Sequence, residues 1–225
     1  MGKILVKNKE MVVPGEVIVE GMDYLPAGNV FRENDKIIAE TIGLVNVDNR
    51  LVKLIPLTGF YKAKKNDVVI GQVRNITFSG WLMDIGCSDL ATLNLRDASS
   101  DFIDKKADLT KIYNFNDTVI AKITNVTKTG YIDLTMRGPG LTKLRGGRLI
   151  KVAASKVPRI IGKQGSMIHI IKEKTNCKVI VGQNGFVWIQ SEDPVNEKKA
   201  IDTIRLIEKE SATEGLTEKV EGLLK

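Results

Sequence analysis

The sequence predicts a multidomain protein that is mainly β over its first two-thirds and α+β over its last third. Short runs of β-branched residues, separated by turns rich in Gly, Pro and Asn, fill residues 1–138. From residue 139 onward, strand-like runs alternate with apolar residues at helical spacing. A chain of 225 residues has room for one to three domains of roughly 100–200 residues each.

Residues 1–60 are predicted to form a small N-terminal β domain. The strand-like runs are residues 16–20, 36–45 and 51–55. Residues 48–50 supply a hairpin turn between the last two runs. No constellation of reactive side chains occurs in this segment, which is therefore interpreted as a docking module.

Residues 61–138 are predicted to form a small closed barrel. The strand-like runs are residues 67–76, 80–86, 118–126 and 130–136. Five short strands with glycine-marked turns and a loop-rich middle at 94–116 suit the OB fold, a common nucleic-acid binder among such barrels.

OB barrels bind single strands through aromatic side chains that stack on bases and through basic residues that follow the backbone. The candidate RNA-binding residues of this barrel are Arg74, Phe78, Trp81, Lys122, Lys128 and Arg137. For Phe78 and Trp81 the alternative is a place in the barrel core, and the sequence leaves that choice open.

Residues 139–210 are predicted to form a KH domain, because the elements follow the order β-α-α-β-β-α. The elements are strand 148–152, helices 155–161 and 166–174, strands 178–181 and 185–190, and a third helix starting near Pro194. Asp193 is the expected N-cap of that third helix. Residues 211–225 are expected to be a mobile or loosely docked helical tail.

The segment Gly162-Lys163-Gln164-Gly165 lies between the first two predicted helices. Two glycines let the backbone turn sharply and approach another backbone closely. The amides at the start of the following helix, with a lysine beside them, suit an anion such as phosphate. KH domains clamp single-stranded RNA with such a loop. Lys156 and Arg159 are further candidate RNA contacts, and a plain helix-helix turn is the alternative interpretation.

The charge distribution indicates a polyanionic partner. The chain has a formal net charge of +7. Residues 143–178 hold ten basic side chains against Glu173 as the single acidic one. A solvated surface usually mixes both signs, so a run of this purity favours nucleic acid.

The sequence argues against an enzyme. The single histidine, His169, is interpreted as an exposed surface residue of the second helix, and no pair of carboxylates or nucleophile with a base is evident. Cys87 and Cys177 lack metal-ligand spacing and are expected to be reduced core thiols. We therefore expect no catalytic residue, no metal and no cofactor. Because neither a membrane helix nor a signal peptide is recognisable, no membrane partner and a cytoplasmic location are expected.

Three segments, residues 134–141, 146–150 and 181–189, resemble the RNA-binding cap subunit family of the archaeal exosome. The resemblance spans essentially the whole chain. It implies a non-catalytic protein that binds single-stranded RNA and favours adenine-rich 3′ ends. It also implies three cap copies on a hexameric ring of two ribonuclease-PH-like subunits, with a second type of cap subunit as an additional partner, and 3′-to-5′ phosphorolytic decay by the ring.

Two points stay open after the resemblance. The segment 182–185 is a feature of the same family, and we interpret it as a turn that packs the KH domain and not as a second clamp. The alternative function is a stand-alone OB/KH RNA-binding or transcription factor. The N-terminal β domain argues against that alternative, because a free RNA binder needs no docking module.

Overall fold

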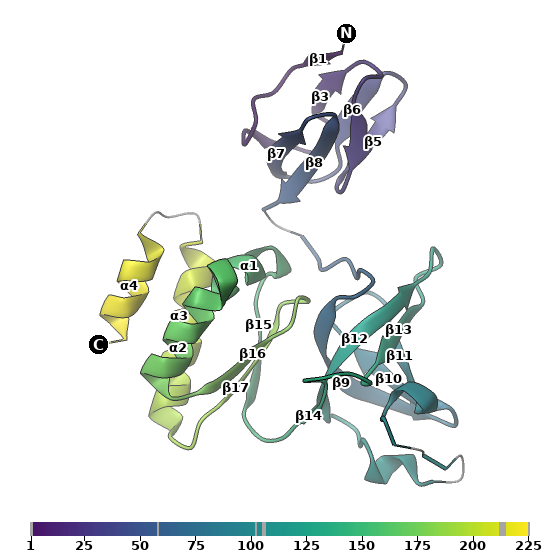
Figure 1. Cartoon of the computed structure of the whole chain (residues 1–225), viewed down its shortest axis with the longest axis vertical. Coiled ribbons are helices and arrows are strands. Elements are labelled where there is room, and N and C mark those ends of the chain that lie inside the picture. The colour runs from purple at the N-terminus through teal and green to yellow at the C-terminus, as the bar shows by residue number, and fades with distance from the viewer. Residues whose placement is uncertain (1, 58, 102, 105–106, 212–214, 225) are drawn as a thin grey trace. The chain divides into compact units, whose positions relative to one another are not determined.

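The computed structural model describes residues 2–57, 59–101, 103–104, 107–211 and 215–224. These residues belong to two compact units, Met1–Gly59 and Phe60–Lys225, which are described separately (Figure 1).

The first unit consists of two four-stranded sheets, in the orders β1-β3-β6-β5 and β2-β7-β8-β4. The strands are β1 (Lys3–Ile4), β2 (Met11–Val12), β3 (Val17–Glu20), β4 (Leu25–Ala27), β5 (Val30–Glu33), β6 (Lys36–Ala39), β7 (Gly43–Asp48) and β8 (Leu51–Pro56). The buried core contains mainly β-branched side chains, among them Ile18, Ile37 and Val52. Small β-branched side chains fill the space between two pleated sheets well.

The predicted strand at 36–45 is wrong in one respect, because the chain changes sheet at its middle. β6 pairs with β3 and β5, whereas β7 pairs with β2 and β8. The run at 36–45 has apolar residues on both sides of the point where β6 ends and β7 begins, so the sequence pattern does not show the change of sheet. The hairpin turn predicted at 48–50 is confirmed, because Asp48 pairs with Leu51 and Asn49 has a φ of 53°.

The second unit begins with a five-stranded barrel, as predicted. Its strands are β9 (Val68–Thr77), β10 (Gly80–Asp84), β11 (Ala91–Asn94), β12 (Thr118–Val126) and β13 (Ile132–Thr135). The order is β13-β11-β10-β9-β12, and pairing of β12 with β13 closes the barrel. β14 (Lys143–Leu144) adds to the free edge of β12. Alternate residues of each strand, such as Val69, Val73 and Ile123, fill the core.

The KH domain follows with the predicted order of elements. They are β15 (Arg148–Lys151), α1 (Val157–Ile161), α2 (Ser166–Thr175), β16 (Lys178–Val181), β17 (Phe186–Gln190) and α3 (Pro194–Lys209). β17 is the central strand between β15 and β16. The predicted N-cap of α3 is confirmed, because the Asp193 side chain accepts a hydrogen bond from the Val195 amide.

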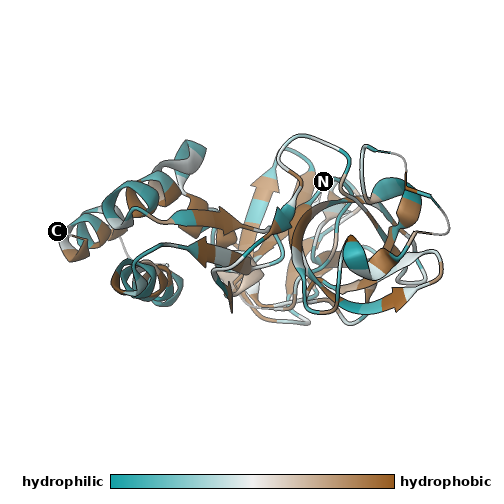
Figure 2. Cartoon of the chain, turned by 90° about the horizontal axis from the view of Figure 1, so that it is seen from below, coloured by the Kyte–Doolittle hydropathy of each residue, from teal (hydrophilic) through white to brown (hydrophobic). Residues whose placement is uncertain are grey.

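Both faces of the KH sheet are covered. On one face, Val179, Val187 and Ile189 pack against the helices. On the other face, Trp188 packs against Ile70 and Ile120 of the barrel. Brown and teal alternate along the strands and helices in Figure 2, as expected for elements with one buried side. The second unit is therefore a stack of helices, sheet and barrel with two apolar layers.

The C-terminal tail contains a docked helix. α4 (Leu216–Leu223) packs beside α3, and the side chains of Leu216, Val220 and Leu224 join the KH core. Residues 212–214 and 225 of this tail lie outside the described residues. Of the two forms expected for residues 211–225, the described part is helical and contributes to the core.

Candidate nucleic-acid interface

The glycine loop (residues 162–165) has a backbone that requires glycine at its start. α1 ends where the Gly162 amide donates a hydrogen bond to the Pro158 carbonyl at 3.0 Å, and Gly162 has a φ of 76°. A Cβ at Gly162 would lie 2.7 Å from the Met167 nitrogen, in the first turn of α2. Glycine therefore provides both the left-handed turn and the close approach of the two helices.

The tip of the glycine loop faces solvent. Lys163 and Gln164 are exposed, and Gln164 has a left-handed φ of 52° that turns the chain into α2. Gly165 also has a positive φ, and a Cβ there would touch only the Ile168 side chain, at 3.9 Å. Strained non-glycine backbone at an exposed loop is typical of binding sites.

The electrostatic surroundings of the loop favour an anion. α2 has no side-chain N-cap and no acidic residue in its first turn, so its first backbone amides have no protein side chain as acceptor. Arg159 is exposed on the last turn of α1, and Lys156 is half-buried just before α1. Two of the predicted contacts, Lys163 and Gln164, thus lie between the two loop glycines, whereas Arg159 and Lys156 come three and six residues before Gly162.

The second glycine segment, here called the docking turn (Gly182–Gly185), has a different environment. Asn184 is only 2% exposed. Its side-chain amide donates to the carbonyls of Ile70 and Ile85, both at 2.8 Å, and its Oδ1 accepts from the Ile70 amide at 3.2 Å. Gln183 adds a pair of bonds to the backbone of Val68, at 2.6 and 2.9 Å. The interpretation of this segment as a packing turn agrees with these bonds.

The docking turn occupies a strand edge that the barrel leaves open. β12 pairs with residues 68–72 of β9, whereas β10 pairs with residues 72–77. The first half of β9 therefore has one edge without a strand partner. Gln183 and Asn184 supply the missing hydrogen bonds, so the KH domain completes the barrel. Buried backbone groups need such partners, and the contact fixes the two domains to each other.

The predicted stacking role of Trp81 is wrong, because the side chain lies in the barrel core with no exposed surface. Its Nε1 donates to the Tyr113 carbonyl at 2.8 Å, and its ring meets the Tyr113 ring edge-on at 5.1 Å. Phe78, in contrast, is 96% exposed at the turn between β9 and β10. Only Phe78 of this pair has a ring face available to a base.

The predicted cations of the barrel do not form one cluster. Arg74 pairs with Asp84 at 3.3 Å, and Arg137 donates to the Ser99 carbonyl at 2.9 Å. Because β12 runs antiparallel to the first half of β9, Lys128 beyond the end of β12 lies at the opposite end of β9 from Phe78. Lys122 lies between them, beside Thr135 of β13. The structure thus spreads these residues over the length of the barrel.

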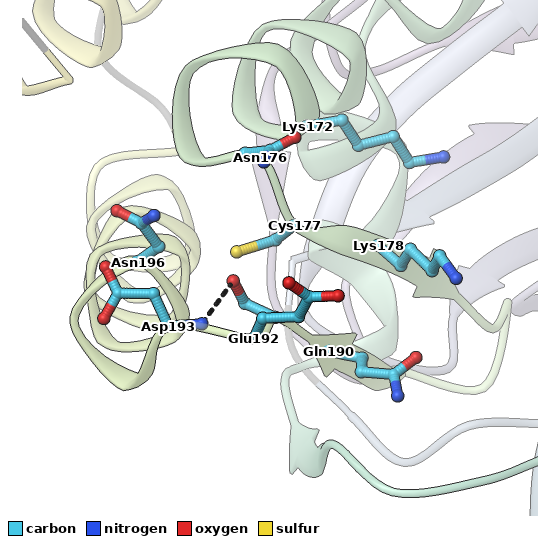
Figure 3. Close-up of a pocket in the computed structure, with 9 residues that line it drawn as sticks. Lys172, Asn176, Cys177, Lys178, Gln190, Glu192, Asp193 and Asn196 are labelled. Carbon is cyan, nitrogen blue, oxygen red and sulfur yellow. Dashed lines mark hydrogen bonds between the residues drawn. The ribbon is translucent and has the colours of Figure 1, made fainter.

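A hollow that we did not predict lies beyond the C-terminal end of α2. This α2–α3 hollow has a volume of about 490 Å³. Its lining residues are Lys172, Asn176, Cys177, Lys178, Gln190, Ser191, Glu192, Asp193 and Asn196 (Figure 3). Two of its lysines belong to the basic run at 143–178, but the run alone does not tell which of its members converge.

The described residues give no support to a catalytic centre. His169 is exposed and lies 3.1 Å from Glu173, its neighbour one turn along α2. Burial raises the pKa of the Cys87 thiol, which disfavours the reactive thiolate. Within the described ranges, no group of three or more His, Cys, Asp or Glu side chains could hold a metal ion. None of the helices there has the length and apolar character needed to cross a membrane.

The fold and the glycine loop together define the class of protein to which the chain belongs. A glycine loop on a KH domain, fixed to a small OB-like barrel, is the architecture of a single-strand nucleic-acid-binding protein. Family models agree: residues 147–195 match a KH domain, and residues 9–58 match the N-terminal domain of the exosome RNA-binding protein RRP4.

Full-length relatives place the chain more narrowly. It is 41% identical to the exosome complex component Rrp4 of Pyrococcus furiosus, over all of this chain and 86% of the relative. It is 39% identical to that of Methanothermus fervidus, over 96% of both chains. A crystal structure provisionally described as an exosome complex RNA-binding protein superposes with a TM-score of 0.67 at 29% identity, covering 74% of this chain and 95% of that one. The chain belongs to the family of exosome complex component Rrp4.

Proposed function

We propose that the chain is a non-catalytic RNA-binding cap component of an exosome. The exposed glycine loop, with its uncapped helix start and free lysine, is the observation that supports RNA binding most directly. Backbone amides and a lysine at a helix start hold phosphate without reading the base. Membership of the Rrp4 family supports the exosome as the assembly in which this binding operates.

The RNA contacts of this proposal come from both domains of the second unit. Gly162 to Gly165, with Lys156 and Arg159, hold the phosphate backbone. On the barrel, Phe78 stacks on a base, and four cations follow the strand. These cations are Arg74, Lys122, Lys128 and Arg137. Because the docking turn fixes the barrel to the KH domain, one RNA strand meets both surfaces at a constant separation.

In this proposal the first unit docks the chain to the ring. It exposes several large apolar side chains in a domain with a small core: Ile4, Leu5, Met11, Val13, Met22, Leu25, Phe31, Leu51 and Ile55. Exposed apolar surface of this kind is typical of protein interfaces. The partner is a hexameric ring of two ribonuclease-PH-like subunits carrying three cap copies, together with a second type of cap subunit. The ring degrades RNA 3′ ends, including adenine-rich ones, by phosphorolysis in the cytoplasm.

Reconstitution tests the proposal. The purified chain is mixed with a ribonuclease-PH-like ring, the mass of the product is measured, and phosphate-dependent decay of a 3′-tailed RNA is followed. We expect an inert chain that joins the ring and speeds decay. A chain that stays free while binding RNA would instead support a stand-alone RNA-binding factor, and one that degrades RNA alone would overturn the non-catalytic assignment.

A further inference from the structure

The α2–α3 hollow contains polar side chains without partners inside the protein. These side chains come from four elements and from the residue that follows α2, yet none of them makes a hydrogen bond or an ion pair with another described residue. They are those of Lys172, Asn176, Lys178, Gln190 and Asn196. Figure 3 shows Lys172, Lys178 and Gln190 extending in the same direction, from α2, β16 and β17 respectively. Unpaired polar side chains that line one concave site are typical of a ligand-binding surface.

The hollow lies on the same side of α2 as the glycine loop. Ile168 and Lys172 are four residues apart and therefore share one face of α2, and Asn176 is the left-handed residue that follows the last turn of the helix. Gly165, three residues before Ile168, starts this row. Seven residues separate Gly165 from Lys172, which corresponds to about 10 Å along the helix axis. A strand held at the glycine loop can therefore reach the hollow within a few nucleotides.

The charged side chains of the hollow are two lysines and two carboxylates. Lys172 and Lys178 present two ammonium groups, and three amide side chains add neutral donors and acceptors. The carboxylate of Asp193 accepts a hydrogen bond from the Val195 amide at the start of α3, at 2.9 Å, and keeps its charge. The carboxylate of Glu192 makes no hydrogen bond or ion pair with another described residue. The carboxylate of Glu192 provides a direct way to test the sign of the ligand's charge.

We propose that the α2–α3 hollow binds a second stretch of the same single-stranded RNA, with Lys172 and Lys178 holding a phosphate and the amide side chains facing the attached nucleotide. This inference rests on the proposed RNA-binding function and extends it. The RNA track then runs from the glycine loop along α2 to the hollow. Lys172 and Lys178 become binding residues, in addition to those at the loop.

The test compares two double variants of equal charge in the full chain. Lys172→Gln/Lys178→Gln removes the two ammonium groups of the hollow. Lys174→Gln/Lys209→Gln removes two exposed lysines outside it, of which Lys174 lies on the other side of α2. Affinity for a fluorescent single-stranded RNA is measured by anisotropy at several salt concentrations. We expect the hollow variant to lose about tenfold in affinity at low salt and to lower the salt slope by about 0.7, the contribution of the one phosphate that the two lysines hold.

Glu192→Gln should change RNA affinity in the opposite direction to the lysine substitutions. Removing this carboxylate should tighten RNA binding, whereas Glu221→Gln on the exposed side of α4 should change it much less. Thermal unfolding of every variant checks that the exposed substitutions leave the fold intact. The inference is overturned if the hollow variant binds as the lysine control does, or if Glu192→Gln matches Glu221→Gln.

The same assay separates the two proposals. Wild-type binding that depends on salt and is weakened by Lys163→Asp/Gln164→Asp supports the glycine loop, whatever the hollow does. If the hollow variant is then unaffected, only the extended track fails. If the wild-type chain does not bind RNA at all, the proposed function itself fails.

Discussion

The glycine loop and the docking turn share the spacing Gly-x-x-Gly within one KH domain, yet their surroundings are opposite. The loop exposes both of its central side chains to solvent. The docking turn buries Asn184, whose side chain forms hydrogen bonds with the barrel backbone. Spacing of glycines thus sets the local backbone, whereas the neighbouring surface decides whether the segment can bind a ligand.

The difference between the two segments also means that the docking turn contributes to the stability of the fold, whereas the glycine loop contributes to ligand binding. Polar groups of the docking turn replace hydrogen bonds that β9 would otherwise lack, so their loss leaves buried groups unpaired. Polar groups of the glycine loop are hydrated in the free protein, and their loss costs little until a ligand is present. The following variants test this separation, starting with the largest expected effect.

Asn184→Ala should destabilise the second unit most. It removes three hydrogen bonds and leaves the amide and carbonyl of Ile70 and the carbonyl of Ile85 without that partner. We expect the free energy of unfolding to fall by about 2–4 kcal/mol. Urea unfolding followed by tryptophan fluorescence measures the change, because Trp188 lies in the apolar layer between the KH sheet and the barrel.

Gln183→Ala is the matched control for that variant. Gln183 is exposed, and its side chain accepts one bond, from the Val68 amide. Its loss should cost about 1 kcal/mol or less, since water can replace an exposed partner. Equal effects of the two substitutions would contradict the role assigned to Asn184.

Gly185→Ala and Gly165→Ala form a second pair, one from each segment. Both positions have a positive φ, of 85° and 81°, so each alanine brings a similar backbone strain of about 1–2 kcal/mol. A Cβ at Gly185 would also lie 2.3 Å from the Val152 carbonyl oxygen, whereas one at Gly165 meets no atom closer than 3.9 Å. Thermal unfolding should therefore show a clearly larger loss for Gly185→Ala. A reversed order would mean that the loop is the more tightly packed segment.

Lys163→Gln should have the smallest effect on the fold and a defined effect on binding. Removing one phosphate contact should lower the salt slope of RNA binding by about 0.7 without moving the unfolding midpoint. Titrations at several salt concentrations measure it, with Lys209→Gln as an exposed control on α3. An unchanged slope would show that Lys163 does not meet phosphate.

Sequence patterns predicted the second unit well because its elements are periodic and bounded by glycines. The barrel strands alternate, and the Asp193-Pro194 start of α3 is a strong local signal. Strands β1, β2, β4 and β5 of the first unit and β11 of the barrel were missed, and each has only two to four residues, too few to show a clear period. Local patterns therefore found the long elements and missed several of the short ones.

The site was predicted only where its chemistry is local. The glycine loop is contiguous in sequence, so its geometry could be foreseen. Trp81 shares a strand face with Met83 and Ile85, opposite the face of Leu82 and Asp84, and the stacking prediction overlooked this signal of a core position. The partners of Asn184 lie about a hundred residues away, and the hollow joins α2, β16, β17 and α3. Such long-range convergence leaves no mark on a short stretch of sequence.

The central claim is that the glycine loop binds RNA and the docking turn holds the fold. Its most direct test is RNA affinity and unfolding midpoint, measured side by side for Lys163→Asp/Gln164→Asp and Asn184→Ala. Aspartate tolerates the left-handed backbone of position 164, so the loop variant keeps its local structure.

We expect the loop variant to lose most of its RNA affinity with an unchanged midpoint, and Asn184→Ala to show a lowered midpoint. A loop variant that unfolds early, or that binds RNA as the wild-type chain does, would contradict the account.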